Sequence, residues 1–238
     1  MSDRPILFVG DIQGCAEELR ALLKAAGFRA SRHRLIPVGD TINRGPDAPG
    51  VLQVLREAGA EPILGNHERH LLAVVSGREE GDWNREGSAL AQLRSARALD
   101  QAAEWIATWP LLRRGRNWIV VHAGLHPRRE PERTSADFLT EVRFCDAEGN
   151  RPKEADGKLA EPPRGYRPWY EFYRDTSTVI FGHWARQGLL VRDRLRGLDT
   201  GCVYGGELTG LWWPEDRLIQ VPSLQPYRRL PSGKNGTN

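Results

Sequence analysis

Five times along the chain a short apolar run ends in glycine or alanine next to a side chain that can bind a metal. These side chains are Asp11, Asp40, Asn66, His122 and His183. In α/β sheets the carboxyl ends of the strands face the ligand crevice, so residues that follow different strands can converge there. Two carboxylates, one amide and two imidazoles suit two hard divalent cations, with one carboxylate shared between them. The pattern predicts a two-metal site.

Each of these residues also has an ordinary structural explanation when taken alone. A Gly-Asp pair after a strand is usually a turn closed by an Asx bond, and a histidine there is usually a hydrogen-bonded structural residue. Asn66 would be a good N-cap for a helix that starts two residues later. Because turn chemistry alone does not readily produce five such residues in order, each at a strand end, we favour the metal site.

The elements that would position these residues are visible in the first hundred positions, where apolar runs alternate with stretches of helical periodicity. The expected strands cover 6–9, 35–38 and 62–64, and the expected helices cover 16–26, 48–58 and 68–76. Glycines directly after the first two helices are typical of helix C-termini. This order is a βαβαβ unit, which predicts a largely parallel sheet.

The rest of the chain departs from this rhythm. We expect helices over 88–98 and 100–108, and strands over 118–121 and 179–181. Residues 125–176 are polar, rich in proline and weakly periodic, which indicates a cap-like insertion over one face of the domain. Glycine-separated β segments near 189–192, 206–213 and 217–221 predict a second, antiparallel sheet.

The composition is that of an ordinary globular protein, with 39% hydrophobic and 27% charged residues among 238. We expect a single domain over 1–221. No apolar run approaches the roughly 18 residues that a membrane span needs, and a strand at residue 6 leaves no room for a signal peptide. The three widely spaced cysteines argue against a disulfide framework, so we expect a cytoplasmic protein.

The net charge of +3 is concentrated at the C-terminus. Residues 222–238 contain Arg228, Arg229, Lys234 and no acid, so residues 1–221 are neutral overall. A neutral body has no global field for nucleic acid, and we expect no DNA partner. The last 17 residues are rich in proline, serine, glycine and asparagine, which predicts a disordered basic tail.

Five segments resemble, in their order along the chain, the motifs of the calcineurin-like (PPP-type) metallophosphoesterases. They are 10–14 (GDIQG), 39–45 (GDTINRG), 65–68 (GNHE), 122–124 (HAG) and 182–183 (GH). Four further segments narrow the resemblance to the symmetrical bis(5′-nucleosyl)-tetraphosphatases. They are 142–145 (VRFC), 167–169 (RPW), 181–185 (FGHWA) and 198–202 (LDTGC) with Gly205 and Gly206. The resemblance covers residues 5–221.

The resemblance implies a fold of two packed β-sheets flanked by helices, an α/β sandwich, with the cap-like insertion over a two-metal site. It implies metal-dependent hydrolysis of dinucleoside polyphosphates, chiefly of diadenosine tetraphosphate to two ADP. A hydroxide that bridges two cations is a strong nucleophile at neutral pH. We expect Mn²⁺ as the physiological cation, with Mg²⁺ and Co²⁺ as alternatives.

The resemblance also implies which residues bind the cations. Asp11 would bind the first cation, Asp40 would bridge, and the second would be bound by Asn66, His122 and His183. Gln13 stands where most of the superfamily has a histidine that binds the first cation. A glutamine oxygen can coordinate a hard cation but binds softer metals less well than imidazole. Gln13 is therefore either a ligand that favours Mn²⁺ or Mg²⁺ over zinc, or a residue that only supports the ligands.

The substrate would be handled by a second group of residues. His67 would lie beside the leaving-group oxygen as general acid, and Arg44 would hold the phosphate, with Arg143 as a second candidate. Tyr204 falls near the aromatic residue that borders this site in phosphoprotein phosphatases. Asn43 replaces the aspartate with which those phosphatases orient and charge the histidine. This replacement suits a good leaving group such as a nucleoside diphosphate.

Three other functions stay open at this point. A phosphoprotein Ser/Thr phosphatase would use the same metals, and Asn43 argues against it. Removal of dinucleoside-polyphosphate caps from RNA 5′ ends would use the same chemistry on a larger partner. A nucleotide-binding sensor would follow if Gln13 failed to retain the first cation.

Overall fold

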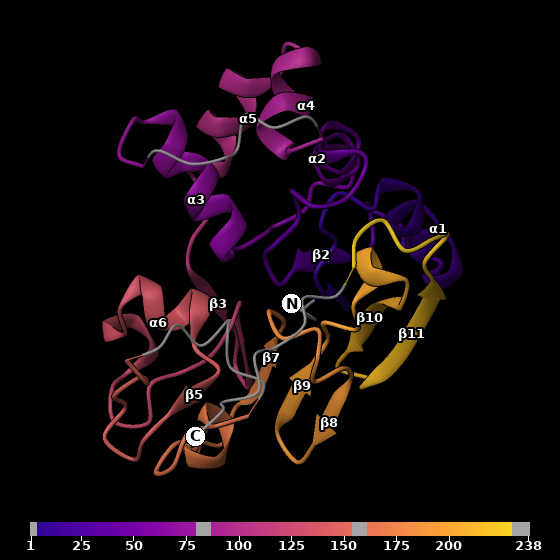
Figure 1. Cartoon of the computed structure of the whole chain (residues 1–238). Coiled ribbons are helices and arrows are strands. Elements are labelled where there is room, and N and C mark those ends of the chain that lie inside the picture. The colour runs from indigo at the N-terminus through magenta and orange to yellow at the C-terminus, as the bar shows by residue number, and fades with distance from the viewer. Residues whose placement is uncertain (1–3, 80–86, 154–160, 230–238) are drawn as a thin grey trace.

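The computed structural model describes residues 4–79, 87–153 and 161–229, and two β-sheets form its centre (Figure 1). The first sheet consists of β1 (Ile6–Val9), β2 (Arg34–Pro37), β10 (Glu207–Trp213) and β11 (Arg217–Pro222), in the order β11-β10-β1-β2. β1 pairs parallel with β2 and antiparallel with β10. All four residues of β1 are buried, because both faces of this sheet are covered by other parts of the chain.

The second sheet has the strand order β3-β4-β7-β9-β8. Its strands are β3 (Leu112–Arg114), β4 (Trp118–Val121), β7 (Thr178–Phe181), β8 (Leu190–Arg192) and β9 (Leu195–Gly197). The three inner strands are parallel, with Ile119 of β4 opposite Val179 of β7. The edge strands β3 and β8 pair antiparallel with their neighbours.

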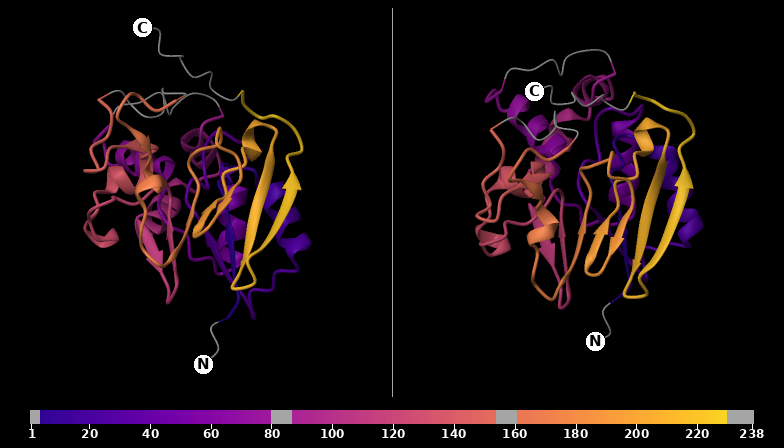
Figure 2. Two further views of the ribbon diagram at one scale, coloured as in Figure 1. Left: turned by 90° about the horizontal axis from the view of Figure 1, so that it is seen from below. Right: turned by 60° about the horizontal axis from the view of Figure 1, so that its bottom comes forward.

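The two sheets pack face to face (Figure 2). Phe8 and Ile36 of the first sheet form one buried cluster with Trp118, Val120 and Ile180 of the second. The rings of Phe8 and Trp118 meet edge to face, with 5.2 Å between their centroids. The expected fold class, two packed sheets flanked by helices, is confirmed.

Two helices cover the outer face of the first sheet. α1 (Ala16–Ala26) and α2 (Ala48–Glu57) contribute Leu19 and Val51 to a cluster with Leu7 and Val9 of β1. Successive residues of β1 therefore point alternately into the two cores, which explains why its sequence is continuously apolar.

A second helical group lies beside α2, at the top of Figure 1. It consists of α3 (Asn66–Val75), α4 (Ala89–Ser95) and α5 (Leu99–Ile106). Leu52 of α2 packs with Leu71, Leu90 and Ile106 from these three helices. Among the described residues, no helix is long and apolar enough to cross a membrane.

Residues 125–176, which we call the inserted segment, pack on the outer face of the second sheet where the chain is described. Their elements are η2 (Pro131–Arg133), α6 (Ala136–Glu141), β5 (Phe144–Cys145), β6 (Arg167–Pro168) and η4 (Trp169–Phe172). Trp169 is fully buried and lies edge-on to Phe181 of β7, with 5.2 Å between ring centroids. The aromatic residue Trp169 therefore anchors the segment to the sheet.

Two details of the predicted fold are wrong. Residues 62–64 run extended beside the first sheet but form no strand, because Pro62 has no N–H to donate. Only the flanking bonds form, from Glu61 N to Leu35 O and from Leu64 N to Pro110 O. The expected antiparallel second sheet is also wrong: β10 and β11 complete the first sheet, and β9 is parallel to β7.

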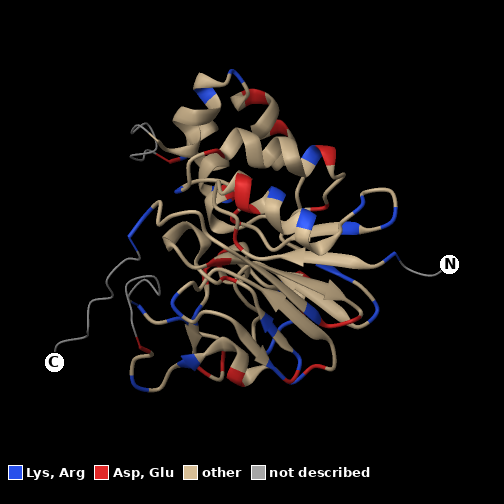
Figure 3. Ribbon diagram, turned by 90° about the vertical axis from the view of Figure 1, so that its right-hand side faces the viewer, with Lys and Arg blue, Asp and Glu red and all other residues tan. Residues whose placement is uncertain are grey.

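The predicted tail is partly ordered. Pro222 ends β11, and residues 223–229 form hydrogen bonds with the body of the protein, which corrects the disorder expected from residue 222 onward. Residues 230–238 lie outside the described part. Lys, Arg, Asp and Glu are interspersed over the view in Figure 3.

Candidate metal centre

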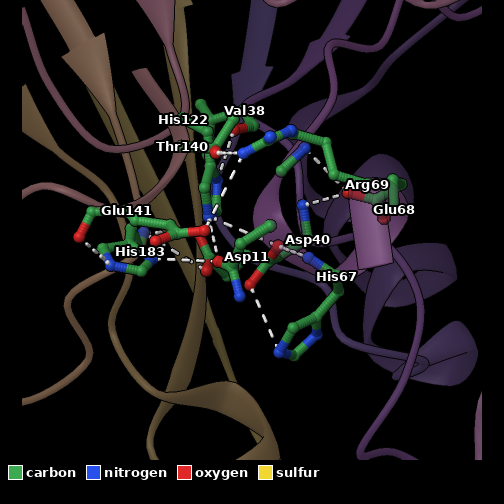
Figure 4. Close-up of polar contacts among 12 residues, drawn as sticks. Asp11, Val38, Asp40, His67, Glu68, Arg69, His122, Thr140, Glu141 and His183 are labelled. Atoms are coloured by element: carbon green, nitrogen blue, oxygen red, sulfur yellow. Dashed lines mark hydrogen bonds and ion pairs between the residues drawn. The ribbon is translucent and has the colours of Figure 1, made fainter. Parts of the chain in front are cut away.

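The five predicted side chains meet where the strands of both sheets end, and Figure 4 labels four of them, Asp11, Asp40, His122 and His183. Asp11, Asp40, His122 and His183 follow β1, β2, β4 and β7, and Asn66 opens α3. The ligand atoms of Asp40, His122 and His183 lie within 4.8 Å of one another. Asn66 Oδ1 is 3.0 Å from His122 Nε2 and 3.0 Å from His183 Nδ1. Asn66 is the first helical residue and Gly65 is the N-cap, so the simple capping explanation for Asn66 is wrong.

Asp40 lies at the middle of the cluster. Its Oδ1 accepts a hydrogen bond from His67 N (3.0 Å) and is 3.3 Å from His122 Nε2, while its Oδ2 is 3.6 Å from His67 Nε2. The histidines His122 and His67 hold the pKa of Asp40 below its usual value although burial acts to raise it. Asp40 therefore presents an ionised carboxylate at the centre of the cluster.

The two histidine rings are oriented as metal ligands require. His122 Nδ1 lies 2.9 Å from Val38 O and His183 Nε2 lies 3.0 Å from Glu141 O. A carbonyl oxygen can only accept, so these two nitrogens carry protons. The opposite nitrogens face Asn66 Oδ1 and are the atoms that a metal ion bound between these side chains would contact. Partners of this kind fix the tautomer of ligating histidines. Burial also lowers the pKa of His183 well below its usual value, so this ring is neutral.

The carboxylates of the cluster lie in a strongly negative environment. Asp11 accepts bonds from His183 N at 3.1 and 3.3 Å, which joins the ends of β1 and β7. Burial, Asp199 and Asp40 raise the pKa of Asp11 well above its usual value. A bound cation would relieve this repulsion between buried carboxylates. Oxygen and imidazole donors with these tautomers fit divalent metal ions.

Gln13 lies in the loop after β1, and its N–H donates to Asp40 O at 2.8 Å. It is buried and has a left-handed backbone, with φ of 50°. Asp40, Asn43, Arg44 and His183 share this conformation, with φ of 46°, 74°, 65° and 70°. Residues with a Cβ adopt it at a cost of about 1–3 kcal/mol each, and such residues cluster at functional sites. The fold thus holds the candidate ligands in place against local strain.

His67 is buried directly beside Asp40. Its Nδ1 donates to Ile42 O at 3.1 Å, so the lone pair of Nε2 points away from this bond. Burial lowers the pKa of His67 to about 4. The carbonyl of Ile42 therefore orients the ring of His67. Asn43, which the sequence predicts to act on the same ring, is the next residue in the chain.

Arg44 and Tyr204 lie together at the rim of the cluster. Tyr204 belongs to η5 (Cys202–Tyr204), and Arg44 donates to its hydroxyl, with the guanidinium carbon 5.7 Å from the ring centroid. Arg44 acts to lower the pKa of Asp11 and of Asp40. Arg143 lies on the side of His183, whose pKa it lowers.

Glu68 is a residue whose role the sequence did not reveal. Its buried carboxylate accepts bonds from Asp40 N (2.9 Å), Thr41 N (2.8 Å) and Gly65 N (2.9 Å). The bond to Gly65 is half of a capping box, which is a local signal. The bonds to Asp40 and Thr41 join residues far apart in sequence and fix the loop that carries Asp40.

Replacing Glu68 with alanine should therefore lower the free energy of unfolding by about 3 kcal/mol or more, because several buried N–H groups lose their acceptor. Urea unfolding at neutral pH in the presence of EDTA measures this difference without a contribution from bound metal. Glu104→Ala, at an exposed position of α5, is the matched control and should leave the free energy nearly unchanged. Equal losses in the two variants would contradict the role of Glu68.

Asp199 is a second carboxylate that was given no role. It is buried two residues after β9 and accepts a bond from Gly201 N at 3.1 Å. Burial raises its pKa to about 6. Its position after a parallel strand repeats the pattern of Asp11 and Asp40, so the same signal in the sequence could have found it.

Two stacked sheets bring buried carboxylates, an amide and imidazoles together at their strand ends. This arrangement is the framework of a metal-dependent phosphoesterase. The model of the calcineurin-like phosphoesterase family matches residues 4–187. The chain belongs to this family, whose members use divalent metal ions.

Its relatives are similar over nearly their whole length. A symmetrical bis(5′-nucleosyl)-tetraphosphatase from Nitrosomonas europaea is 31% identical, with 91% of this chain and 98% of the relative covered. One from Acidovorax sp. (strain JS42) is 34% identical, with 85% and 90% covered. A solved structure assigned provisionally as a diadenosine tetraphosphatase is 33% identical, with a TM-score of 0.78 and 93% and 95% covered. A yeast protein serine/threonine phosphatase shares the fold at 18% identity and a TM-score of 0.57.

Proposed function

We propose that the chain hydrolyses dinucleoside polyphosphates, chiefly diadenosine tetraphosphate, and cuts them symmetrically into two molecules of ADP. The observation that carries this proposal is the likeness to relatives named for this activity over 85–95% of the chain, at 31–34% identity. The likeness includes the described parts of the inserted segment and the strands β10 and β11. The serine/threonine phosphatase, by contrast, resembles the chain in fold alone.

We also propose that two divalent cations bind here, held by Asp11, Asp40, Asn66, His122 and His183, with Gln13 as a further oxygen ligand. When bound, such cations lower the pKa of water and stabilise charge on phosphoryl oxygens. The predominance of oxygen donors favours Mn²⁺, with Mg²⁺ and Co²⁺ as substitutes. We place the protein in the cytoplasm, a proposal supported by three buried cysteines that form no disulfide.

Arg44 is the residue we assign to the phosphate next to the metal centre. A guanidinium can donate two parallel bonds to phosphate oxygens, and its bond to Tyr204 positions it at the rim. Arg143, whose charge acts on His183, is the second candidate for contact with this phosphate.

His67 is the residue we assign to the leaving-group oxygen. With a pKa of about 4 the ring is neutral near pH 7 before substrate binds. The negative charge of a bound polyphosphate raises the pKa of a nearby imidazole, and the Nδ1 bond to Ile42 leaves Nε2 as the atom that takes up and donates the proton. Asn43 adds no charge here, which suits a nucleoside diphosphate as a good leaving group.

The test is a product assay with the purified chain, Mn²⁺ and diadenosine tetraphosphate, in which the nucleotides are separated by chromatography. We expect ADP as the only product and complete loss of turnover in EDTA. We expect Mn²⁺, Co²⁺ or Mg²⁺ to restore turnover better than Zn²⁺.

Other outcomes would overturn particular parts of the proposal. ATP together with AMP would show that the substrate lies across the centre in another register. Cleavage of a phosphopeptide without cleavage of the dinucleotide would identify a protein phosphatase. Faster release of the cap from a dinucleotide-capped RNA than cleavage of the free dinucleotide would make RNA the preferred partner. Tight nucleotide binding without turnover would identify a sensor.

A further inference from the structure

The chain does not leave the body of the protein after its last strand. Residues 223–229, which we call the C-terminal arm, continue from β11 back towards η5 and α1 (Figure 1, yellow). Ser223 N donates to Gly206 O at 2.8 Å. Glu18 of α1, only 2% exposed, accepts from Leu224 N (3.1 Å) and from the Tyr227 hydroxyl (2.9 Å). A buried carboxylate thus anchors the arm at two points.

The arm then packs against the residues on either side of Tyr204. Gly205 has φ of 90°, and a Cβ at this position would lie 3.1 Å from Pro226 Cβ. The next anchor is the bond from Arg228 N to Val203 O, at 3.0 Å. Because Val203 and Gly205 flank Tyr204, the backbone of Arg228 is fixed next to the aromatic residue at the rim of the metal centre.

The side chain of Arg228 reaches the loop that carries Arg44. Its Nε donates to Arg44 O at 3.0 Å. Its terminal nitrogen lies near Gly87, since a Cβ built on Gly87 would be 3.9 Å from that atom. Arg228 is exposed. A guanidinium carries five N–H groups, and the Nε–H of Arg228 is the one that donates to a described residue. Within the described ranges the terminal fork thus has no hydrogen bond of its own, and it lies next to the loop that carries Arg44.

A long, highly charged substrate requires positive groups beyond the metal centre, and the guanidinium of Arg228 is placed to supply one. The metal centre and Arg44 meet one phosphate, whereas a dinucleoside tetraphosphate carries negative charge on both sides of the bond that is cut. We propose that Arg228 binds phosphate oxygens of the substrate half that extends beyond Arg44, which makes the C-terminal arm part of the substrate site. The inference rests on the proposed function, because it needs a substrate that reaches past the metal centre.

The test compares two substrates and adjacent arginines in the full-length, metal-loaded protein. Arg228→Ala should raise KM for diadenosine tetraphosphate about tenfold or more, which is the effect of losing a charge-assisted bond. Hydrolysis of bis(p-nitrophenyl) phosphate, which is too short to reach the arm, should keep its wild-type rate. Arg229→Ala removes the same charge from the next, exposed position and should leave both substrates unaffected. Arg228→Lys should fall between wild type and Arg228→Ala.

A variant of the anchor separates positioning from contact. Tyr227→Phe removes the hydroxyl that donates to Glu18 and keeps the ring. It should raise KM for the dinucleotide by a smaller factor than Arg228→Ala, with kcat and metal content unchanged. An unchanged KM in Arg228→Ala, or equal losses on both substrates, would overturn the inference about Arg228. The proposed function would still stand in that case, provided that the wild-type protein produces ADP. A wild-type protein that does not cleave the dinucleotide would overturn both.

Discussion

Replacing Asp40 with alanine should lower turnover of diadenosine tetraphosphate by roughly three orders of magnitude or more and should also lower the amount of bound metal. Asp40 is the ionised carboxylate at the middle of the cluster, and it contacts both His122 and His67. Its removal deletes the ligand proposed to be shared by two cations and leaves the N–H of His67 without its acceptor.

The substitution Asp40→Asn separates these two effects. Asparagine retains an oxygen that can accept from His67 N, so folding should be preserved while the negative charge is lost. Metal content by mass spectrometry, measured beside kcat, should fall together with activity in both variants. Asp100→Asn, at an exposed position in the first turn of α5, is the control and should match wild type. Full metal occupancy in Asp40→Asn with normal turnover would remove Asp40 from the centre.

Replacing His67 with alanine should slow turnover of the same substrate by about 10²–10⁴-fold, the usual contribution of a general acid, with metal content unchanged. Nε2 of His67 has no bond to the Ile42 carbonyl, and it lies 3.6 Å from Asp40 Oδ2 at the edge of the cluster. This placement lets the ring serve a leaving oxygen without binding metal.

The dependence on the leaving group distinguishes proton donation from other roles. A p-nitrophenolate leaves without protonation, so bis(p-nitrophenyl) phosphate should lose much less rate in His67→Ala than a diester with an alkyl leaving group. His33→Ala, in the loop before β2, is the matched histidine control and should leave both rates unchanged. A uniform loss over all leaving groups, or a loss of bound metal, would contradict the role of general acid.

Much of the first half of the fold was predictable because it depends on local patterns. The expected strand over 6–9 and helix over 16–26 coincide with β1 and α1. The strand expected over 62–64 failed on one residue, because an apolar run that contains Pro62 cannot complete a ladder. The assignment of β10 and β11 to a separate sheet failed for another reason. β10 pairs with β1, about 200 residues earlier in the chain, and no local pattern reveals such a pairing.

Local sequence patterns likewise identify some residues of the candidate site and miss those whose partners lie far away in the sequence. Asp11, Asp40 and His122 were identifiable because each directly follows an apolar strand, and the topology brings strand ends together. Glu68 looks locally like a helix cap, and its main partners lie 27 and 28 residues away. The composition of residues 222–238 predicted disorder, yet the Tyr227 hydroxyl donates a hydrogen bond to Glu18, which lies 209 residues earlier in the sequence.

The position of β1 between β2 and β10 has a consequence for biosynthesis. β1 and β2 are synthesised early, but β10, which pairs with the other edge of β1, begins only at residue 207. Until β10 has been synthesised this apolar strand has an open edge, the kind of surface that pairs wrongly with other chains. Because non-local pairing is slow, the surroundings of the candidate metal centre at the end of β1 are completed only after β10 has been synthesised. A chain that stops before residue 207 lacks one of the two neighbours of β1 in the first sheet.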